Sequence, residues 1–170
     1  MNIFKQQPKN TNTQLPNHYK LVFPKVRNLE YFCQDVQLPS VSFPPIPNSN
    51  PFVDMYVPGD KLKFDPLIIE FKVDEEFRVY EDIFSWMVGL TFPHEFEDYN
   101  LQNKKGKYAD GSLIAVPSSN DTETKKPIGF RFVNMFPFYL GGIRFSTTDT
   151  GTQIMTTQAQ FAYTLFDIIR

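Results

Sequence analysis

The stretch that decides the fold is residues 61–89, where KLKFDPLIIEFKV is followed directly by DEEFRVYEDIFSWMVG. In the first part, Ile69, Phe71 and Val73 fall on one side of an extended chain, and charged residues fall between them. Alternation with a period of two is typical of a strand with one buried face. Residues 61–73 are therefore predicted to form a strand.

Residues 74–89 carry the pattern of a helix. Asp74 is the predicted helix N-cap, because its carboxylate can accept backbone N–H bonds from the first turn. Gly89 is a natural C-terminal stop. Apolar side chains recur at helical spacing and line one stripe, namely Phe77, Tyr80, Phe84 and Met87.

The rest of the chain predicts strands. Runs rich in β-branched and aromatic residues occur at 18–23, 29–38, 52–57, 112–116, 128–134, 143–146 and 153–166. The first two runs are close enough in sequence to form a hairpin. A total of about seven to nine strands with one helix predicts a mainly β fold, an antiparallel β-sandwich or barrel with one flanking α-helix.

Residues 40–60 stand apart from this pattern. The segment holds Pro44, Pro45, Pro47 and Pro51. Because proline removes a backbone donor, we expect a long loop whose only strand is at 52–57. The sequence Pro58-Gly59-Asp60 predicts a turn.

Length and composition favour a single domain. The chain has 170 residues and a net charge of −2, without the basic excess of a dedicated nucleic-acid binder. Residues 1–17 are polar and are expected to be a flexible N-terminal arm, and residues 18–170 a single β domain. No run approaches the roughly 20 apolar residues of a membrane span, so no membrane partner is expected. The lone Cys33 excludes an intrachain disulfide.

Catalytic and metal-binding patterns are weak. His18 and His94 are the only histidines, and neither has a ligand-spaced Cys or His neighbour. Acidic residues at 74–76 are explained by helix capping, and those at 95–98 by a solvated loop. Gly141-Gly142 does not open a phosphate-binding helix. The sequence therefore predicts no enzyme, no catalytic residue, no metal and no cofactor.

Aromatic residues are abundant. The chain has 18 Phe and 8 Tyr. A domain of this size is not expected to bury all of them, and surplus aromatic side chains suit subunit interfaces. The composition therefore favours a protein that associates with itself.

The order of several short motifs resembles the tail tube proteins of contractile-tailed, T4-like bacteriophages, including the related baseplate tube-initiator proteins. The motifs are Phe32-Cys33 leading to Leu38-Pro39, Val57-Pro58-Gly59-Asp60, Phe64-Asp65, the strand at 67–73, Asp74-Glu75 with the helix ending near Trp86, and Phe136-Pro137 with a final alternating strand. The resemblance covers most of residues 29–168.

This resemblance implies a structural virion protein that assembles into hexameric rings, which stack into the inner tail tube of a contractile phage tail. Genomic DNA would pass through the lumen without specific binding. The expected partners are copies of the same chain, the tail sheath, and baseplate or neck proteins. The implied location is the virion tail, assembled in the host cytoplasm. The loop at 40–60 matches the region that reaches adjacent subunits, so the implied ring contacts are Phe43, Asn48, Asn50, Phe52, Tyr56, Gly59 and Asp60.

Two alternatives remain at this point. The first is a baseplate tube-initiator or tail-completion ring, which shares the fold but would not polymerise into long tubes. The second belongs to another class, a β-sandwich binding module that presents residues 40–60 to a host ligand. The sequence departs from the simplest tube pattern in its long polar segments at 1–17, 94–111 and 117–127. Both the tube subunit and the ring protein therefore remain as hypotheses.

Overall fold

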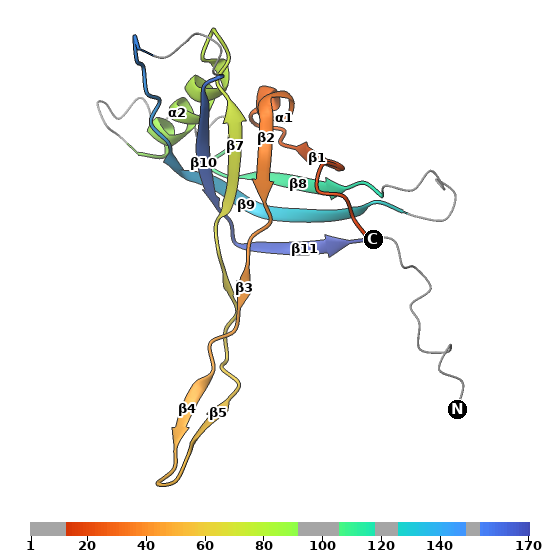
Figure 1. Ribbon diagram of the computed structural model, residues 1–170, viewed down its shortest axis with the longest axis vertical. Coiled ribbons are helices and arrows are strands. Elements are labelled where there is room, and N and C mark those ends of the chain that lie inside the picture. The colour runs from red at the N-terminus through yellow and green to blue at the C-terminus, as the bar shows by residue number, and fades with distance from the viewer. Residues whose placement is uncertain (1–12, 92–105, 118–125, 149–153) are drawn as a thin grey trace.

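The computed structural model describes residues 13–91, 106–117, 126–148 and 154–170. In these residues the chain forms a seven-stranded antiparallel sheet with strand order β1-β8-β9-β10-β7-β2, and β11 pairs with β9 beside this path (Figure 1). The strands are β1 Tyr19–Val22, β2 Cys33–Gln37, β7 Leu67–Lys72, β8 Ala109–Ala115, β9 Ile128–Leu140, β10 Thr156–Ala162 and β11 Leu165–Ile169. The predicted mainly β fold is confirmed.

The long strand β9 divides the sheet into two parts. Its first part, up to Met135, pairs with β8 and β11, and we call β1, β8, β11 and this part of β9 sheet A. Its last part, residues 136–140, pairs with β10, and we call β2, β7, β10 and this part sheet B. The predicted strand at 128–134 is thus too short. Pro137 does not end β9, because this half of the strand is an edge, where proline costs no ladder bond.

A β-bulge turns β9 from one sheet into the other. Asn134 has a left-handed backbone with a φ of 56°. Opposite it, the pairing skips from Ala109 with Met135 to Gly111 with Phe132, which leaves an extra residue on β9. The Asp110 carboxylate accepts the backbone N–H of Asn134 at 3.1 Å. A bulge of this kind bends the strand and increases its twist.

One apolar core lies between the two sheets and the helices. Its buried members come from both sheets and both helices but not from the arm at 40–65: Leu21, Phe23, Val26, Leu29, Leu67, Ile69, Phe71, Val79, Ile83, Trp86, Leu113, Phe132, Met135, Ala159 and Phe161. The alternation in β7 is as predicted, since Leu67, Ile69 and Phe71 are fully buried. The predicted strand at 61–73 is interrupted, however, at Asp65-Pro66.

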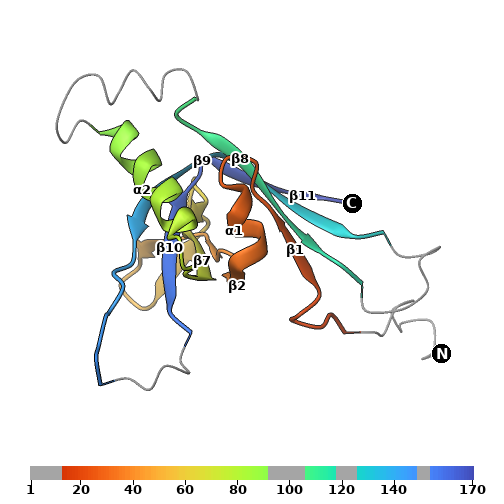
Figure 2. The same ribbon diagram turned by 90° about the horizontal axis from the view of Figure 1, so that it is seen from above.

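Two helices flank the sheet where the sequence predicted one. Figure 2 shows α2, Arg78–Leu90, beside sheet B and α1, Arg27–Phe32, in the gap between β1 and β2. The predicted strand at 29–38 is therefore wrong in its first half. There the chain forms α1, whose Leu29 is fully buried and whose Glu30 carboxylate accepts the backbone N–H of Phe23 at 2.6 Å.

Helix α2 begins later than predicted. Its N-cap position is occupied by Phe77, in a left-handed conformation with φ 55°, and not by Asp74. A turn closed by the Phe77 N–H and the Asp74 carbonyl precedes the helix. The Asp74 carboxylate still accepts the backbone N–H groups of Arg78 at 3.1 Å and Val79 at 3.5 Å. The Asp74 carboxylate therefore accepts the hydrogen bonds expected of an N-cap, although Asp74 lies before the N-cap position at Phe77.

The C-terminal region holds two strands in place of the single strand predicted at 153–166. β10 belongs to sheet B and β11 to sheet A, and the chain changes sheets at Tyr163 and Thr164. Thr164 donates its N–H to the Val133 carbonyl, and Tyr163 packs against Phe132 and Phe166. Residues 143–146, also predicted as a strand, form no regular element.

Residues 40–65 form a long two-stranded arm, not the loop that the prolines predicted. Near the body β3, Val41–Ser42, pairs with β6, Lys63–Phe64. Further out β4, Ile46–Ser49, pairs with β5, Asp54–Val57. Figure 1 shows the arm projecting far below the two sheets. Each arm strand has a free edge, so its prolines can face away from the ladder.

Candidate assembly surface

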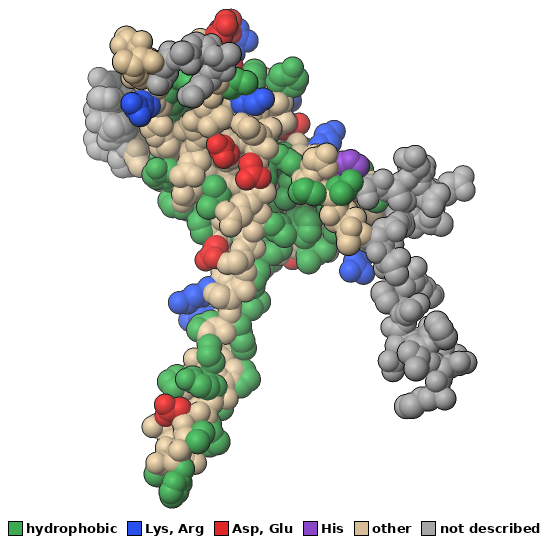
Figure 3. Space-filling model, in the orientation of Figure 1, with side chains coloured by type: hydrophobic (Ala, Val, Ile, Leu, Met, Phe, Trp, Pro, Cys, Tyr) green, Lys and Arg blue, Asp and Glu red, His purple; other side chains and the backbone are tan. Residues whose placement is uncertain are grey.

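The arm is the main candidate functional surface because it exposes apolar side chains along its whole length. Large apolar residues at least two-fifths exposed are Val41, Phe43, Ile46, Phe52, Val53, Met55, Tyr56, Val57 and Leu62. Figure 3 shows hydrophobic side chains from the base of the arm to its tip. An isolated two-stranded ribbon is marginally stable in water, and a contiguous apolar patch usually marks an interaction site.

All seven residues predicted as ring contacts lie on this arm. Phe52 stands at the tip and is 92% exposed, whereas Tyr56 lies in β5 and is 67% exposed. Asn48 pairs with Met55 across the ribbon. Asn50 lies between the two strands at the tip, and Phe43 and Asp60 lie on opposite limbs nearer the body. Their role as subunit contacts remains a prediction.

Gly59 has a specific place in the arm. A Cβ atom at this position would lie 2.4 Å from the carbonyl oxygen of Pro44 on the opposite limb. Such a distance is far inside van der Waals contact, so only glycine allows the two limbs to approach so closely. The predicted turn at Pro58-Gly59-Asp60 is wrong, since the chain continues toward the body there and bends only at Asp60.

Hydrogen bonds join the two limbs of the arm at its base, and a further bond from Tyr163 fixes this base to the body. Asp65 donates its N–H to the Ser40 carbonyl at 3.1 Å, and the Ser40 hydroxyl donates to the Asp65 carboxylate. The Tyr163 hydroxyl donates to the Asp65 carbonyl at 2.8 Å. Burial raises the pKa of Tyr163 to about 12, and the Asp65 charge acts in the same direction, so this hydroxyl keeps its proton. The arm is thus anchored at its base and uncovered beyond it.

Sheet A offers a second exposed surface at β11. Leu165, Ile168 and Ile169 are 44%, 62% and 51% exposed. Within the described residues β11 pairs only with β9, so its other edge is unpaired. Unpaired apolar edges readily accept a strand from another chain.

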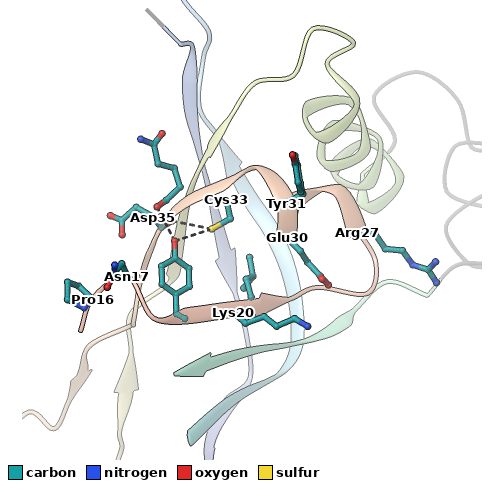
Figure 4. Close-up of a pocket in the computed structure, with 11 residues that line it drawn as sticks. Pro16, Asn17, Lys20, Arg27, Glu30, Tyr31, Cys33 and Asp35 are labelled. Carbon is teal, nitrogen blue, oxygen red and sulfur yellow. Dashed lines mark hydrogen bonds between the residues drawn. The ribbon is translucent and has the colours of Figure 1, made fainter. Parts of the chain in front are cut away.

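A groove of about 790 Å³ lies between β1 and β2 (Figure 4). Its charged lining residues are Lys20, Arg27, Glu30 and Asp35. Tyr19 crosses the groove and donates its hydroxyl to the Gln34 carbonyl at 3.0 Å. Burial raises the pKa of Tyr19 to about 12 and also raises the pKa of the neighbouring Cys33 thiol. Neither group is poised to act as a nucleophile or base at neutral pH.

Sequence reasoning missed part of this surface. It did not single out the aliphatic arm residues or the apolar edge of β11, because it treated 40–60 as a loop and 165–166 as the end of one strand. The period-two spacing of Met55 and Val57 was an available signal. The segments at 94–105 and 118–125 and the acidic residues at 95–98 lie outside the described residues.

The described part of the chain shows no cluster of three or more His, Cys, Asp or Glu side chains that could hold a metal ion. In the same residues, no helix is long and apolar enough to cross a membrane.

A mainly β body with an apolar arm that is anchored at its base and uncovered beyond it is typical of proteins that bind other subunits through an exposed surface. The family model of phage tail tube proteins matches residues 5–168, so the chain belongs to the phage tail tube protein family. It is therefore a phage tail component with a structural role and not an enzyme.

The chain is also similar to individual proteins. The tail tube terminator protein of Enterobacteria phage T4 is 25% identical over 111 residues, which cover 65% of this chain and 60% of that protein. The match therefore spans less than two thirds of that relative.

Solved structures share the fold. The tube-terminating cap of the anti-feeding prophage has a TM-score of 0.60 at 13% identity, over 99% of each chain. A chain in the six-fold symmetrised baseplate of the anti-feeding prophage has a TM-score of 0.57 at 11% identity, over 93% of this chain and 97% of that one. At such identities these likenesses establish the fold alone.

Proposed function

We propose that this chain forms a ring that terminates a phage tail tube. The projecting arm carries this proposal, because its large apolar side chains remain at least two-fifths exposed within the described chain. Burying them needs another subunit. A ring of copies on the end of a tube supplies such subunits, both within the ring and in the tube beneath it.

The similarity to the T4 tail tube terminator supports a terminating role over that of the repeating tube subunit. The fold shared with a tube-terminating cap supports the same choice. The fold shared with a baseplate chain keeps a tube initiator as the second candidate. In both roles the ring contacts the tube on one side only. The terminator and the initiator would lie at opposite ends of the tail.

In this proposal the ring is hexameric, belongs to the virion tail, and contacts tube and sheath or neck proteins. The DNA path runs through the ring without specific binding. The overall charge of −2 is compatible with that path, because a lumen that is not basic does not retain a polyanion.

Negative-stain electron microscopy of the purified chain over a concentration series tests the proposal. We expect single rings that do not extend into tubes. Long homopolymers would contradict termination and restore the role of tube subunit. A chain that stays monomeric at every concentration would contradict ring formation, and would favour the binding-module alternative.

A further inference from the structure

The arm is continuous with sheet B at both of its limbs. Residues 38–40 join it to β2, and Asp65-Pro66 join it to β7. Beyond these joints the arm is a two-stranded ribbon, and its outer strands β4 and β5 are exposed. A ribbon with few buried contacts pivots easily about its points of attachment. The direction of the arm relative to the body is therefore set by the contacts made at its base.

One aromatic ring of the arm packs on sheet A. Phe64, at the end of β6, has its ring centroid 5.5 Å from that of Phe166 in β11 and 6.0 Å from that of Tyr163. Tyr163 and Phe166 pack in turn against Phe132, which is buried in the core. Tilted and edge-to-face ring pairs at such separations are favourable beyond the area that they bury. The arm is thus continuous with sheet B and in contact with sheet A.

A hydrogen bond acts at the same point. The Tyr163 hydroxyl donates to the Asp65 carbonyl at 2.8 Å, so it holds the main chain of the limb and not a side chain. Tyr163 lies where the chain passes from β10 to β11, and Figure 1 shows the arm leaving the body beside the start of β11. The base of the arm is therefore bonded to the place where the two sheets meet.

These few contacts hold the base without close packing on every side. Phe64 belongs neither to the buried core nor to the side chains packed against it in the described chain. A hollow of about 180 Å³ lies beside the base and is lined by Phe64, Asp65, Pro66, Phe138, Ala162 and Tyr163. A base with open space beside it can pivot once its contacts are lost, since no neighbouring atoms block the movement.

We infer that Phe64, Tyr163 and Phe166 form an aromatic latch that holds the arm in one direction relative to both sheets while the chain is still free. Because Phe64 belongs to the arm and Phe166 to β11, the latch joins the two exposed apolar surfaces into one unit. The inference rests on the proposed function, in which the arm packs against other subunits. A segment that is held before binding loses less conformational freedom on binding, so the latch strengthens assembly.

Single-molecule FRET on separate chains at picomolar concentration tests the latch. Dyes are attached to Asn50→Cys at the tip of the arm and to Glu81→Cys on α2, both exposed positions, in a Cys33→Ser background. Donor lifetimes report the spread of distances between the dyes even when the movement is fast. We expect one narrow distribution for the otherwise wild-type chain.

Three variants remove parts of the latch. Phe64→Ala removes the ring on the arm without touching the core, and we expect a broad distribution with an unchanged melting temperature. Phe166→Leu keeps apolar bulk on β11 and should also broaden the distribution, although this residue is not on the arm. Tyr163→Phe removes only the hydrogen bond to Asp65 and should have a smaller effect.

The matched control is Phe136→Ala. This ring is also partly buried, but it lies on β9 and contacts Tyr108 instead of the base of the arm. We expect this variant to lower the melting temperature and to leave the spread of distances unchanged. A purely structural role for Phe64 would give the same result in the Phe64→Ala chain.

Assembly is measured separately, by mass photometry of the unlabelled chains. We expect the ring population of Phe64→Ala to fall by about tenfold, because each arm must then be ordered on binding. The inference is overturned if the wild-type distribution is already as broad as that of Phe64→Ala, or if Phe64→Ala assembles as wild type does. In either case wild-type rings would still support the proposed function. Absence of wild-type rings at every concentration would count against the proposed function, whereas the FRET distributions would still decide whether the latch exists.

Discussion

At the residue scale, Asp110 shows how a single side chain holds the bend between the sheets. Its carboxylate accepts the Arg131 guanidinium at 2.9 Å and the backbone N–H of Asn134 at 3.1 Å. The Arg131 hydrogen bond, followed by that of Asn134, holds the pKa of Asp110 below its usual range. Sequence patterns could not reveal this contact, because the bulge and the left-handed Asn134 arise only when β8 and β9 are paired.

Replacing Asp110 with alanine is expected to lower the free energy of unfolding by about 1 kcal/mol at neutral pH, since the ion pair is half-exposed and mainly the backbone bond is lost. The contribution is present above the pKa of an unfolded aspartate, about 4, and is lost as pH falls through the lower folded pKa. Urea unfolding of both proteins should therefore show a gap at pH 7 that closes in acid. An equal gap at both pH values would contradict the role given to the carboxylate.

The core residue Ile69 gives a second prediction at this scale. Its side chain is fully buried in β7. Ile69→Asp, like Phe161→Asp, should unfold the subunit, because a buried unpaired charge is costly. Ile69→Val is the matched control and should cost only about 0.5–1.5 kcal/mol. Circular dichroism distinguishes the variants, and a folded Ile69→Asp protein would contradict the assigned core.

At the scale of elements, a strand with one buried face could be predicted from the sequence. Elements whose bounds depend on pairing with a distant strand could not. The alternation in β7 follows from local sequence. The stripe predicted for the helix, Phe77, Tyr80, Phe84 and Met87, is wrong, because α2 buries Val79, Ile83, Trp86 and Gly89 and leaves Phe84 54% exposed. The division of the last strand into β10 and β11 depends on the position of β9, which no local pattern contains. The arm was predicted as a loop because its prolines lie among its apolar residues and interrupt the period-two pattern. Its role in subunit contacts stays a prediction.

The arm should be separable from the body. Deleting residues 48–51 removes the tip without touching the core, so we expect a folded monomer that assembles poorly. Double substitution of Phe52 and Tyr56 by serine should act similarly. Size-exclusion chromatography with thermal unfolding measures both effects. The control Phe84→Ser removes a similarly exposed aromatic ring from α2. Normal assembly of the deletion variant would refute the role of the arm.

Gly59→Ala is a finer test of the same element. The added methyl group would meet the Pro44 carbonyl, so the limbs of the arm must move apart. We expect the melting temperature of the body to change little and assembly to weaken. Gly142→Ala is the control, because a Cβ atom there meets no neighbour within 4 Å. Equal assembly of the two variants would contradict the close approach of the limbs.

At the scale of the whole molecule, the protein combines a body that has its own buried core with apolar surfaces that stay exposed. The core is shared by both sheets and both helices. The arm and the edge of β11 remain uncovered. Composition indicated a self-associating β protein, and the resemblance of short motifs indicated its family. The choice between tube subunit and terminator could not come from composition, because both need the same core and the same exposed edges.

The most direct test of the terminating role is to add the chain to growing tail tubes built from the matching tube subunit, and to follow tube length and end labelling by electron microscopy. We predict that the chain binds one end of the tube as a single ring, stops elongation there and is absent from the tube wall. Incorporation along the wall, or tubes that grow unchanged with no labelled end, would contradict it.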